Sequence, residues 1–525
     1  MLKMLLVPLF SIACVQSTVE MGGADQLPPP IAPGFVLNVP ASASPGDTIT
    51  VTASLPPGAP RNEVRLMLGL GGLGAGPCLV APGNPCLDVA GPVRALGAAT
   101  PVGGQATWTL RLPAVAPLGS YGLQGAQFAG GAWTLTTPVS LNLVAPVLPV
   151  CGDGELELGE ACVADAILED LRTDRQGTLV AVSHSSGWPA PVEGGLLFVS
   201  DQPGPWTLAG DHSGWTSQPM RADAGFRWRI EPTAIAGGYK FFDGTTWRPD
   251  PWARAYDYDV NGEISLQQAT WAHIERLPEV GGNGLRSRTL RAWVPGGPVT
   301  HVVYAHDGQN LFDPGAIWGG WRMQNAIPAG MMVVGIDNTP DRMDEYTHVV
   351  DVIGGSAMGG TGDAYADYVE QTVRPLVRSV WGEPARVGLL GSSLGGLISL
   401  HIADRYPTSY DFVASMSGTL GWGSIGASNE TILERYDGQG PRGFVVFADS
   451  GGNGPCFDSD GDGLEDDSPT AADNYCETRQ FVDQLAADGY TWGTDLHHWW
   501  EPGAPHNEVA WGDRVFRPLQ VFAGL

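Results

Sequence analysis

The sequence predicts a multidomain protein in which an all-β sandwich and a second β-rich module precede an α/β domain. Three observations predict this architecture. The chain has 525 residues, which suits about three domains of roughly 100–200 residues each. Short runs of alternating apolar and polar residues, the period of strands, fill the first half. From residue 272 onward, apolar strands alternate with helical stretches, a pattern typical of a mostly parallel, doubly wound sheet.

The composition indicates a folded protein and argues against a nucleic-acid partner. Hydrophobic residues make up 43% of the chain, which is enough for several cores. The formal net charge of -28 repels phosphate backbones, so we expect no binding to nucleic acid. No apolar run reaches the roughly 18 residues that a membrane-spanning helix needs.

The first residues have the pattern of an export signal. Residues 1–14 combine an early Lys3, a short apolar stretch and the small Ala13 directly before Cys14. The stretch is too short for a membrane anchor and is typical of a signal peptide. It resembles a lipoprotein signal, in which Cys14 becomes the lipid-modified first residue. We therefore expect an exported bacterial protein: a lipoprotein of the outer membrane, periplasm or cell surface, held by its lipid alone, or a secreted protein after ordinary cleavage.

The segments that follow are expected to form a linker, a spacer domain and a hinge. Residues 15–35 are rich in proline and glycine and read as a linker. Residues 36–147 alternate apolar and polar residues between glycines and prolines, which predicts an Ig-like β-sandwich. We find no catalytic constellation there and interpret the sandwich as a spacer. Residues 148–165 are a compact acidic hinge, which we expect a disulfide to close.

Seven cysteines are present, and six remain after Cys14. Behind a signal peptide, an even number of cysteines favours disulfides over free thiols or zinc ligands. The sequence does not decide the connectivity, so proximity along the chain is the guide. The expected pairs are Cys78–Cys86, Cys151–Cys162 and Cys456–Cys476.

Residues 166–271 are again β-patterned, with runs such as GLLFVS and GFRWRIEP. The stretch GGYKFFDGTTWRPDPWARAYDYD resembles the early-set module, an Ig-like fold, that precedes the catalytic domains of glycogen-branching enzymes, isoamylases and enterochelin esterases. In some of these relatives the module binds α-glucan, which implies a glycan contact through Trp215, Trp247 and Trp252, whose flat faces suit sugar rings. Core or interdomain packing of these tryptophans is the interpretation we favour.

Residues 391–395, GSSLG, fit the pattern G-x-S-x-G between a predicted strand, RVGLL, and a predicted helix, GLISLHIADRY. This context is typical of the nucleophile elbow of α/β-hydrolases, a tight turn that needs glycine because backbones pass close to each other. The elbow would present the Ser393 hydroxyl above the sheet at a helix N-terminus. A plain strand-to-helix turn is the alternative.

A serine hydroxyl is a poor nucleophile near neutral pH and needs a base. In this fold the base lies C-terminal to the serine, after the last strand. Of the four histidines that follow Ser393, His401 lies on the predicted helix, and His497 and His498 lie in the strand-like run DLHHWW. His506 lies in the loop GAPHNEVAW before the final helical segment, so we predict that it is the base.

Four segments give residues 272–525 a specific resemblance. They are, in chain order, YAHDGQNLFD (304–313), VGIDNTPDRMDEY (334–346), GSSLGGL (391–397) and PGAPHNEVAW (502–511). They resemble the putative-esterase family of α/β-hydrolases, which includes enterochelin esterases, feruloyl esterases, S-formylglutathione hydrolases and mycolyltransferases. The resemblance implies an oxyanion hole made by the backbone amides of Gln309 and Leu394. We expect Trp318 and Trp321 to wall the substrate pocket.

One more pair is expected near this site. Arg342 and Glu345 lie three residues apart in one of the four segments. We expect them to pair and brace the site, with a simple surface ion pair as the alternative.

The acid of the triad must lie between Ser393 and His506 in chain order. Asp449 ends the apolar strand GFVVFAD, and Asp473 directly precedes the helix NYCETRQFVDQLAADGY. In the similar esterases the acid follows a short loop after this strand and precedes this helix. If the acidic residues in between are an insertion, Asp473 takes that position. We predict Asp473, with Asp449 as the alternative and a loop aspartate such as Asp458 as the third choice.

The segment between that strand and helix has a calcium-like pattern, D-x-D-x-D-G-x-x-D. Carboxylates at alternate positions converge on one hard cation, and Gly463 permits a sharp turn. The EF-hand glutamate is absent because Pro469 stands in its place, so the loop resembles thrombospondin- or dockerin-type repeats. The predicted ligands are Asp458, Asp460, Asp462, Leu464 and Asp466. A solvated acidic loop without metal is the alternative.

Together these motifs predict a serine carboxylic-ester hydrolase that works through an acyl-serine. The expected substrate is an extracellular ester, either polysaccharide-linked, siderophore-like or simple, and the sequence does not choose among them. Acyl transfer to an alcohol other than water is the alternative reaction. A non-catalytic, glycan-binding surface lipoprotein is the alternative from another class. We expect no organic cofactor and one structural Ca²⁺.

Overall fold

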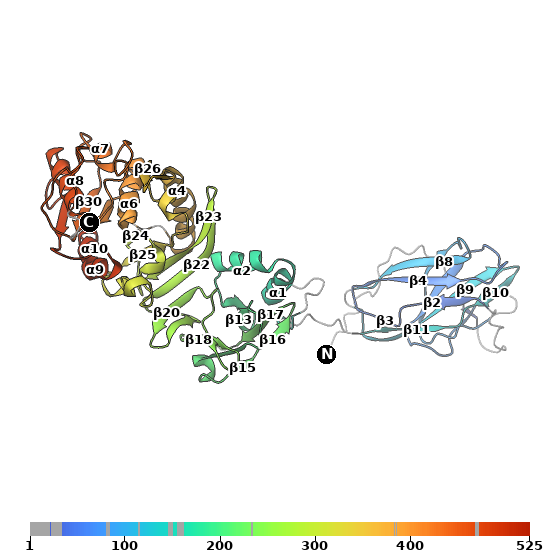
Figure 1. The fold of residues 1–525 in the computed structure, drawn as a ribbon. Coiled ribbons are helices and arrows are strands. Elements are labelled where there is room, and N and C mark those ends of the chain that lie inside the picture. The colour runs from blue at the N-terminus through green and yellow to red at the C-terminus, as the bar shows by residue number, and fades with distance from the viewer. Residues whose placement is uncertain are drawn as a thin grey trace, which may run out of the picture. The chain divides into compact units, whose positions relative to one another are not determined.

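The computed structural model divides the chain into two compact units, Met1–Pro149 and Val150–Leu525 (Figure 1). The described residues are 21–22, 34–79, 85–113, 116–144, 151–154, 162–232, 235–382, 384, 386–467 and 472–525. The predicted signal peptide with Cys14, and most of the predicted linker at 15–35, lie outside the described residues. Within the described residues, no helix combines the length and apolar character that crossing a membrane requires.

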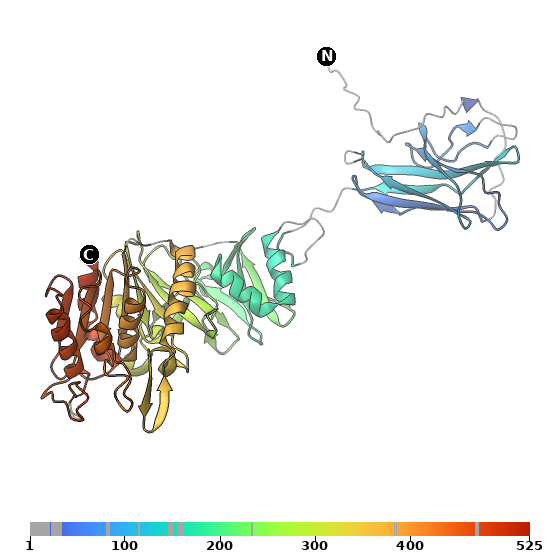
Figure 2. The same ribbon diagram turned by 90° about the horizontal axis from the view of Figure 1, so that it is seen from above.

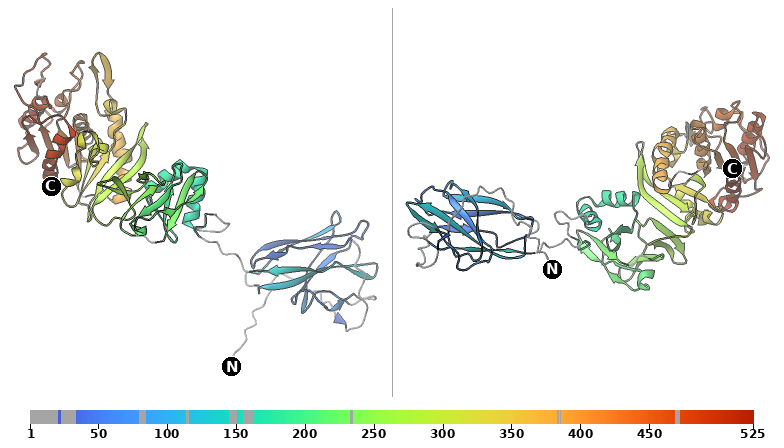
Figure 3. Two further views of the ribbon diagram at one scale, coloured as in Figure 1. Left: turned by 60° about the horizontal axis from the view of Figure 1, so that its bottom comes forward. Right: turned by 180° about the vertical axis from the view of Figure 1, so that it is seen from behind.

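The described part of the first unit is made of strands (Figure 3). They are β1 (Met21–Gly22), β2 (Val36–Asn38), β3 (Ser42–Ala43), β4 (Thr48–Ser54), β5 (Val64–Gly69), β6 (Cys78–Leu79), β7 (Val93–Ala99), β8 (Gln105–Arg111), β9 (Gly119–Ala129), β10 (Ala132–Leu135) and β11 (Val139–Leu143). One sheet has the order β2-β4-β8. A second has the order β3-β11-β9-β5-β7, with β10 paired to β9, and β1 and β6 form a separate two-stranded sheet.

The two larger sheets of the first unit share one apolar core. Strand β8 shows how the sequence builds it, because its residues alternate between exposed and buried along QATWTLR. The buried side chains, among them Trp108 and Leu110, meet Leu66 and Leu123 from the other sheet. The prediction of a β domain at the N-terminal end is therefore confirmed, and its Ig-like assignment over 36–147 stays a prediction.

The second unit begins with two helices, α1 (Val163–Thr173) and α2 (Arg175–His184). The expectation that residues 166–271 are β-patterned is wrong for this first part. In α1 the buried residues Ala164, Leu168 and Leu171 recur at spacings of four and three, which is the helical period. Charged residues between them hide this period from a search for strand alternation.

The rest of the module is β structure. Its elements are β12 (Ala190–Val192), β13 (Gly195–Ser200), β14 (Thr207–Gly210), the short helix η1 (Asp211–Ser213), β15 (Gln218–Pro219), β16 (Arg221–Asp223), β17 (Phe226–Glu231), β18 (Gly238–Phe242), β19 (Trp247–Arg248), β20 (Ala255–Asp259) and β21 (Gly262–Leu266). Four of them form a sheet in the order β12-β13-β17-β16. The others join a 14-stranded sheet that continues into the α/β domain. The expected boundary at 271–272 is crossed there by the pairing of β20 with β22, in which Tyr256 lies opposite Ile274.

The α/β part supplies eight strands to this sheet, in the order β22-β23-β25-β24-β28-β29-β30-β31. Their bounds are β22 (His273–Gly282), β23 (Leu285–Val294), β24 (His301–His306), β25 (Met331–Ile336), β28 (Arg386–Ser392), β29 (Phe412–Met416), β30 (Val445–Ser450) and β31 (Leu496–Trp500). The last six in this order are parallel to one another. Strands β22 and β23 pair antiparallel, and β26 (Val350–Ile353) and β27 (Ser356–Gly359) form a separate hairpin.

Helices follow or separate these strands (Figure 2). They are η2 (Gly308–Asn310), η3 (Ile317–Gly319), η4 (Met323–Asn325), α3 (Arg342–Glu345), α4 (Gly362–Tyr368), η5 (Val369–Val373), α5 (Arg374–Trp381), α6 (Leu394–Arg405), α7 (Ile432–Tyr436), α8 (Tyr475–Ala487), α9 (Glu508–Arg514) and α10 (Phe516–Ala523).

Neighbouring residues of one strand pack into different cores. In β24, Tyr304 belongs to a cluster with residues of α4, α6, α7 and α8. The next residue, Ala305, belongs to a cluster with residues of α9 and α10. Because successive side chains of a strand point to opposite faces, helices cover both faces of the parallel strands. The functional segments follow the strands at their carboxyl ends, which is where such sheets place their sites.

All three expected disulfides are present. They are Cys78–Cys86, Cys151–Cys162 and Cys456–Cys476. The pairing predicted from proximity is confirmed. The third bond joins the acidic segment after β30 to the start of α8.

Candidate functional site

Ser393 lies in a sharp turn between β28 and α6. Its φ and ψ angles are 55° and -126°, a conformation that a residue with a side chain rarely adopts and that surrounding structure must hold. Its amide donates to the Met416 carbonyl at 3.0 Å. A Cβ atom on Gly391 would lie 2.2 Å from the Gly395 carbonyl oxygen, so only glycine fits at this crossing. The residues G-x-S-x-G therefore form the tight turn that the pattern predicts.

His506 lies in the loop between β31 and α9. Its Nδ1 atom is 2.7 Å from Oδ1 of Asp473. A carboxylate only accepts, so Nδ1 carries the proton and Nε2 is left to accept one. The ring packs edge-on against Trp511 at 4.9 Å between centroids. Asn507 then caps α9 by accepting from the Ala510 amide, which fixes the end of the loop.

The carboxylate that contacts His506 is that of Asp473, not that of Asp449 or of Asp458. Asp473 is 1% exposed. Its second oxygen accepts from Ser417 Oγ at 2.8 Å, from the Gly451 amide at 2.5 Å and from Arg514 at 3.2 Å. Both oxygens are thus fully engaged, which fixes the orientation of the carboxylate toward the imidazole.

Asp449 has a different environment at the end of β30. It is buried and accepts from Arg514 Nε at 3.2 Å. Burial raises the pKa of Asp449 to about 7, although the Arg514 guanidinium acts in the opposite direction. Arg514 therefore bridges the two competing aspartates, and only one of them reaches the histidine.

Ser393 and His506 line the same pocket, whose volume is roughly 210 Å³. The two predicted tryptophans, Trp318 and Trp321, line it as well. Trp318 is 61% exposed and Trp321 is buried, so one indole is open to solvent at the pocket while the other is part of the core. The Ser393 hydroxyl contacts Thr419 Oγ1 at 3.5 Å.

The amides expected to form the oxyanion hole belong to adjacent strand ends. Gln309 lies in η2, directly after β24, and Leu394 is the first residue of α6, directly after β28. Strands β24 and β28 are parallel neighbours, so both segments emerge at the same edge of the sheet. The first amides of a helix have no acceptor within it, so they are free to bind an anion. The Gln309 side chain accepts from the Asn338 amide at 3.0 Å, which holds the turn.

The expected pair Arg342–Glu345 is wrong. Arg342 binds Asp307 instead, with contacts of 2.7 and 2.8 Å, and Glu345 forms a buried ion pair with Arg288 at 2.7 Å. Asp307 lies directly after β24, where its backbone is left-handed. Both Asp307 and Arg342 line the pocket, so this pair lies at the site rather than bracing it from outside.

Sequence reasoning missed several polar residues of the pocket, namely Asn310, Asn338 and Glu508. Glu508 is buried, and this burial raises the pKa of its carboxyl. It accepts from Asn310 Nδ2 at 3.2 Å. A signal existed in the segment HNEVAW, because Glu508 lies at the start of the helix that directly follows His506.

The other three late histidines lie elsewhere. His401 is buried on α6, with Nε2 2.9 Å from Asp363 Oδ1. His497 and His498 lie on β31, where the alternation of the strand directs them to opposite faces. Among the candidate bases in the described residues, His506 is the one that shares a pocket with Ser393.

The acidic segment brings three of its predicted ligands together. Ligand oxygens of Asp458, Asp460 and Asp462 all lie within 4.8 Å of one another. The fourth carboxylate, that of Asp466, accepts from the Ser459 amide at 2.8 Å. The Leu464 side chain packs against the core. The arrangement suits a hard cation such as Ca²⁺ at the first three carboxylates.

The three tryptophans of the β module separate into two groups. Trp252 is buried, and its Nε1 donates to Asp201 at 3.0 Å. Trp215 and Trp247 are 37% and 44% exposed, with ring centroids 6.0 Å apart. Packing thus accounts for Trp252, and an accessible aromatic surface remains at the other two.

Residues 290–519 match a family model described as putative esterase. Uncharacterized protein YbbA of Bacillus subtilis (strain 168) is 31% identical over 127 residues, which are 22% of this chain and 49% of that protein. Siderophore triacetylfusarinine C esterase of Aspergillus fumigatus is 35% identical over 68 residues, which are 13% of this chain and 23% of that protein. The chain thus spans half or less of the length of these curated relatives.

Solved structures also resemble the chain. An IroE-like serine hydrolase from Shewanella oneidensis has 19% identity and a TM-score of 0.38, over 48% of this chain and 80% of that chain. Ferric enterobactin esterase from Salmonella typhimurium has 14% identity and a TM-score of 0.37, over 63% and 93%. Siderophore hydrolase EstA from Aspergillus nidulans has 18% identity and a TM-score of 0.36, over 48% and 94%.

Proposed function

We propose that the protein is a serine carboxylic-ester hydrolase, because residues 290–519 match the putative-esterase family model and carry a matching set of catalytic groups. One observation carries the proposal. His506 Nδ1 lies 2.7 Å from the buried carboxylate of Asp473, at a pocket that Ser393 also lines. A serine on an elbow, a histidine and an acid in this chain order make up a hydrolase triad.

The reaction proceeds in two steps. Ser393 Oγ attacks the ester carbonyl while His506 Nε2 accepts its proton, and Asp473 stabilises the positive imidazole that forms. The amides of Gln309 and Leu394 hold the negative oxygen of the tetrahedral intermediate, and each such donor contributes roughly 3 kcal/mol. The intermediate collapses, and the alcohol leaves with the proton from His506. Water then attacks the acyl-serine with the same base and releases the acid.

The pocket supports a compact, polar ester as substrate. Asn310, Asn338 and Glu508 offer hydrogen-bonding groups beside the indole of Trp318. Burying such groups against a long alkyl chain would leave them unpaired, which costs free energy. A siderophore-like ester fits this polarity, as does a polysaccharide-linked or small simple ester. Transfer of the acyl group to an alcohol other than water is the second reaction that the same residues support.

Hydrolysis of a p-nitrophenyl acetate substrate tests the proposal. Ser393→Ala and His506→Ala should each reduce kcat by about 10⁴-fold or more, because triad members act as a unit. His497→Ala is the matched control, since that histidine lies on β31 away from the pocket, and its turnover should stay close to that of the wild type. Wild-type turnover in Ser393→Ala would contradict the proposal.

Three accessory features complete the proposed function. Export with lipid on Cys14 rests on residues 1–14, and mass spectrometry of the N-terminal peptide from a bacterial host tests it. A Ca²⁺ ion in the acidic loop at 458–466 rests on its converging carboxylates. A sugar contact rests on the exposed Trp215 and Trp247, and a pull-down on insoluble α-glucan tests it. Esterase turnover in the p-nitrophenyl acetate assay would exclude the alternative that the protein is a non-catalytic, glycan-binding surface lipoprotein.

A further inference from the structure

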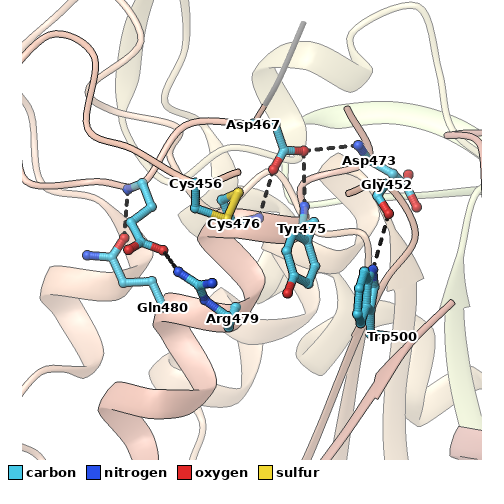
Figure 4. The surroundings of a disulfide bond; sticks show 10 residues. Gly452, Cys456, Asp467, Asp473, Tyr475, Cys476, Arg479, Gln480 and Trp500 are labelled. Carbon is cyan, nitrogen blue, oxygen red and sulfur yellow. Dashed lines mark hydrogen bonds and ion pairs between the residues drawn. A yellow bond between two sulfur atoms is a disulfide. The ribbon is translucent and has the colours of Figure 1, made fainter. Parts of the chain in front are cut away.

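The carboxylate of Asp467 binds three backbone amides at the start of α8 (Figure 4). Its Oδ2 accepts from the amides of Asp473 and Tyr475, each at 3.0 Å. Its Oδ1 accepts from the Cys476 amide at 2.7 Å. One of these three amides belongs to the residue whose side chain contacts His506.

These amides need an acceptor from outside their own helix. Tyr475 and Cys476 are the first two residues of α8, and such amides have no partner within the helix. The residue at the N-cap position, Asn474, has a left-handed backbone, and its side chain does not cap the helix. It donates instead to the Ser417 carbonyl at 2.8 Å. Asp467 supplies the missing cap, and its negative charge suits the N-terminal end of a helix.

The position of Asp467 is itself held by the acidic segment. The disulfide Cys456–Cys476 ties the segment to α8. Glu465 forms an ion pair with Arg479, and its amide donates to Gln480 Oε1 at 2.9 Å. Figure 4 shows the disulfide, Arg479 and Gln480 along the helix, with Asp467 at the end nearest Asp473.

We propose that Asp467 is a positioning residue for the catalytic acid: it fixes the backbone of Asp473 and, through the carboxylate of Asp473, the imidazole of His506. The inference rests on the proposed function, because only a triad gives that imidazole a task. The side chain of Asp473 is held by Ser417, Gly451 and Arg514. Its backbone amide, in contrast, is held by Asp467. Removing Asp467 therefore frees the chain that carries the acid while leaving the pocket intact.

The test compares Asp467→Ala and Asp467→Asn with Gln480→Ala. The control removes the hydrogen bonds of Gln480 to Glu465 and Gly463. It leaves the disulfide Cys456–Cys476 and the Glu465–Arg479 ion pair, which also hold the segment, and every contact of Asp467 and Asp473. We expect Asp467→Ala to lower kcat for p-nitrophenyl acetate by roughly 10²-fold, as a small misplacement of catalytic groups does, with KM unchanged. Asp467→Asn retains one acceptor oxygen and should recover part of that loss. Gln480→Ala should keep kcat within about twofold of wild type, because it leaves the triad geometry that sets the rate untouched.

Proton NMR gives a readout that does not need turnover. The proton between His506 Nδ1 and Asp473 resonates far downfield, and the signal should weaken or vanish in both Asp467 variants and persist in Gln480→Ala. If both Asp467 variants fold and keep the signal and kcat of the wild type, Asp467 only stabilises α8 and the inference is overturned. If Asp467→Ala does not fold, the Asp467→Asn result decides. If the wild type shows no ester turnover, the proposed function fails, and the NMR comparison still decides whether Asp467 positions the pair.

Discussion

The segments that carry Ser393 and Asp473 both follow parallel strands of one sheet, yet they are fixed in different ways. The nucleophile turn at 391–395 is set by close contact between its own glycines. The acid lies at the end of a long connection between β30 and α8, and its position depends on His506, on Arg514 and on other residues distant in sequence. A short turn can thus encode one catalytic group locally, whereas the other is placed by long-range contacts.

Substitution of each of the two buried aspartates in turn should give the largest difference in activity. Asp473→Asn should reduce kcat by about 10⁴-fold, because the histidine then takes the wrong tautomer. Asp449→Asn should cost less than about tenfold, because Asp449 contacts Arg514 and not His506 and the triad stays whole. Both variants are assayed with p-nitrophenyl acetate after circular dichroism confirms that they fold. A collapse of Asp449→Asn beside a near-normal Asp473→Asn would reverse our assignment of the acid.

The same contrast explains what the sequence could predict. Ser393 and the glycines around it form a short pattern whose geometry is local, and His506 follows from chain order. The sequence favours Asp473 over Asp449 only if the acidic residues between strand and helix are treated as an insertion. The ion pair of Arg342 with Asp307 and the contacts of Arg514 could not be predicted, because their partners lie on segments that only the folded sheet brings together.

A glycine substitution tests whether close packing of its own glycines fixes the nucleophile turn at 391–395. In Gly391→Ala the new Cβ would lie 2.2 Å from a backbone oxygen, so the turn must shift, which costs about 3 kcal/mol of unfolding free energy. Gly454→Ala, in the connection between β30 and α8, is the control, because its new Cβ would lie 3.6 Å from the nearest atom, the Cys456 amide nitrogen. Urea denaturation measures the free energy of unfolding of both variants. Equal stability of the two would show that the elbow does not depend on close glycine packing.

Calcium should stabilise the connection between β30 and α8, which contains the acidic loop at 458–466, and leave the nucleophile turn at 391–395 unaffected. At free Ca²⁺ about 100 times the dissociation constant, a site formed only in the folded state adds about 2.7 kcal/mol to the free energy of unfolding. Thermal unfolding with calcium and with a chelator measures the effect, and Asp460→Asn should remove it. An identical Tm under both conditions would mean that the loop is a solvated acidic loop that binds no calcium.

His306, the last residue of β24, should make the stability of the folded protein sensitive to acid. Burial, aided by Arg342 and Arg288, lowers the pKa of His306 to about 3. The unfolded chain binds this proton near pH 6.5 and the folded chain does not, so the contribution of His306 to stability is complete above pH 6.5 and is lost as the pH drops toward 3. The slope is about 1.4 kcal/mol per pH unit for one proton.

Unfolding free energies measured between pH 6.5 and pH 4 test this effect. The variant His306→Gln should reduce the slope of unfolding free energy against pH by the amount that one proton contributes. His348, whose pKa burial lowers to about 4, should keep its own contribution to the dependence. An unchanged slope in His306→Gln would mean that this histidine titrates alike in both states.

Covalent labelling tests the central claim most directly. A fluorophosphonate reacts only with a serine that an adjacent base activates, and it forms a stable adduct in place of the acyl-serine. Peptide mass spectrometry of the labelled protein should find one adduct, on Ser393, and labelling should be lost in Ser393→Ala and strongly slowed in His506→Ala and Asp473→Asn. An adduct on Ser392 or another serine, or no adduct in protein that hydrolyses esters, would contradict the assignment of Ser393, His506 and Asp473 as the catalytic triad.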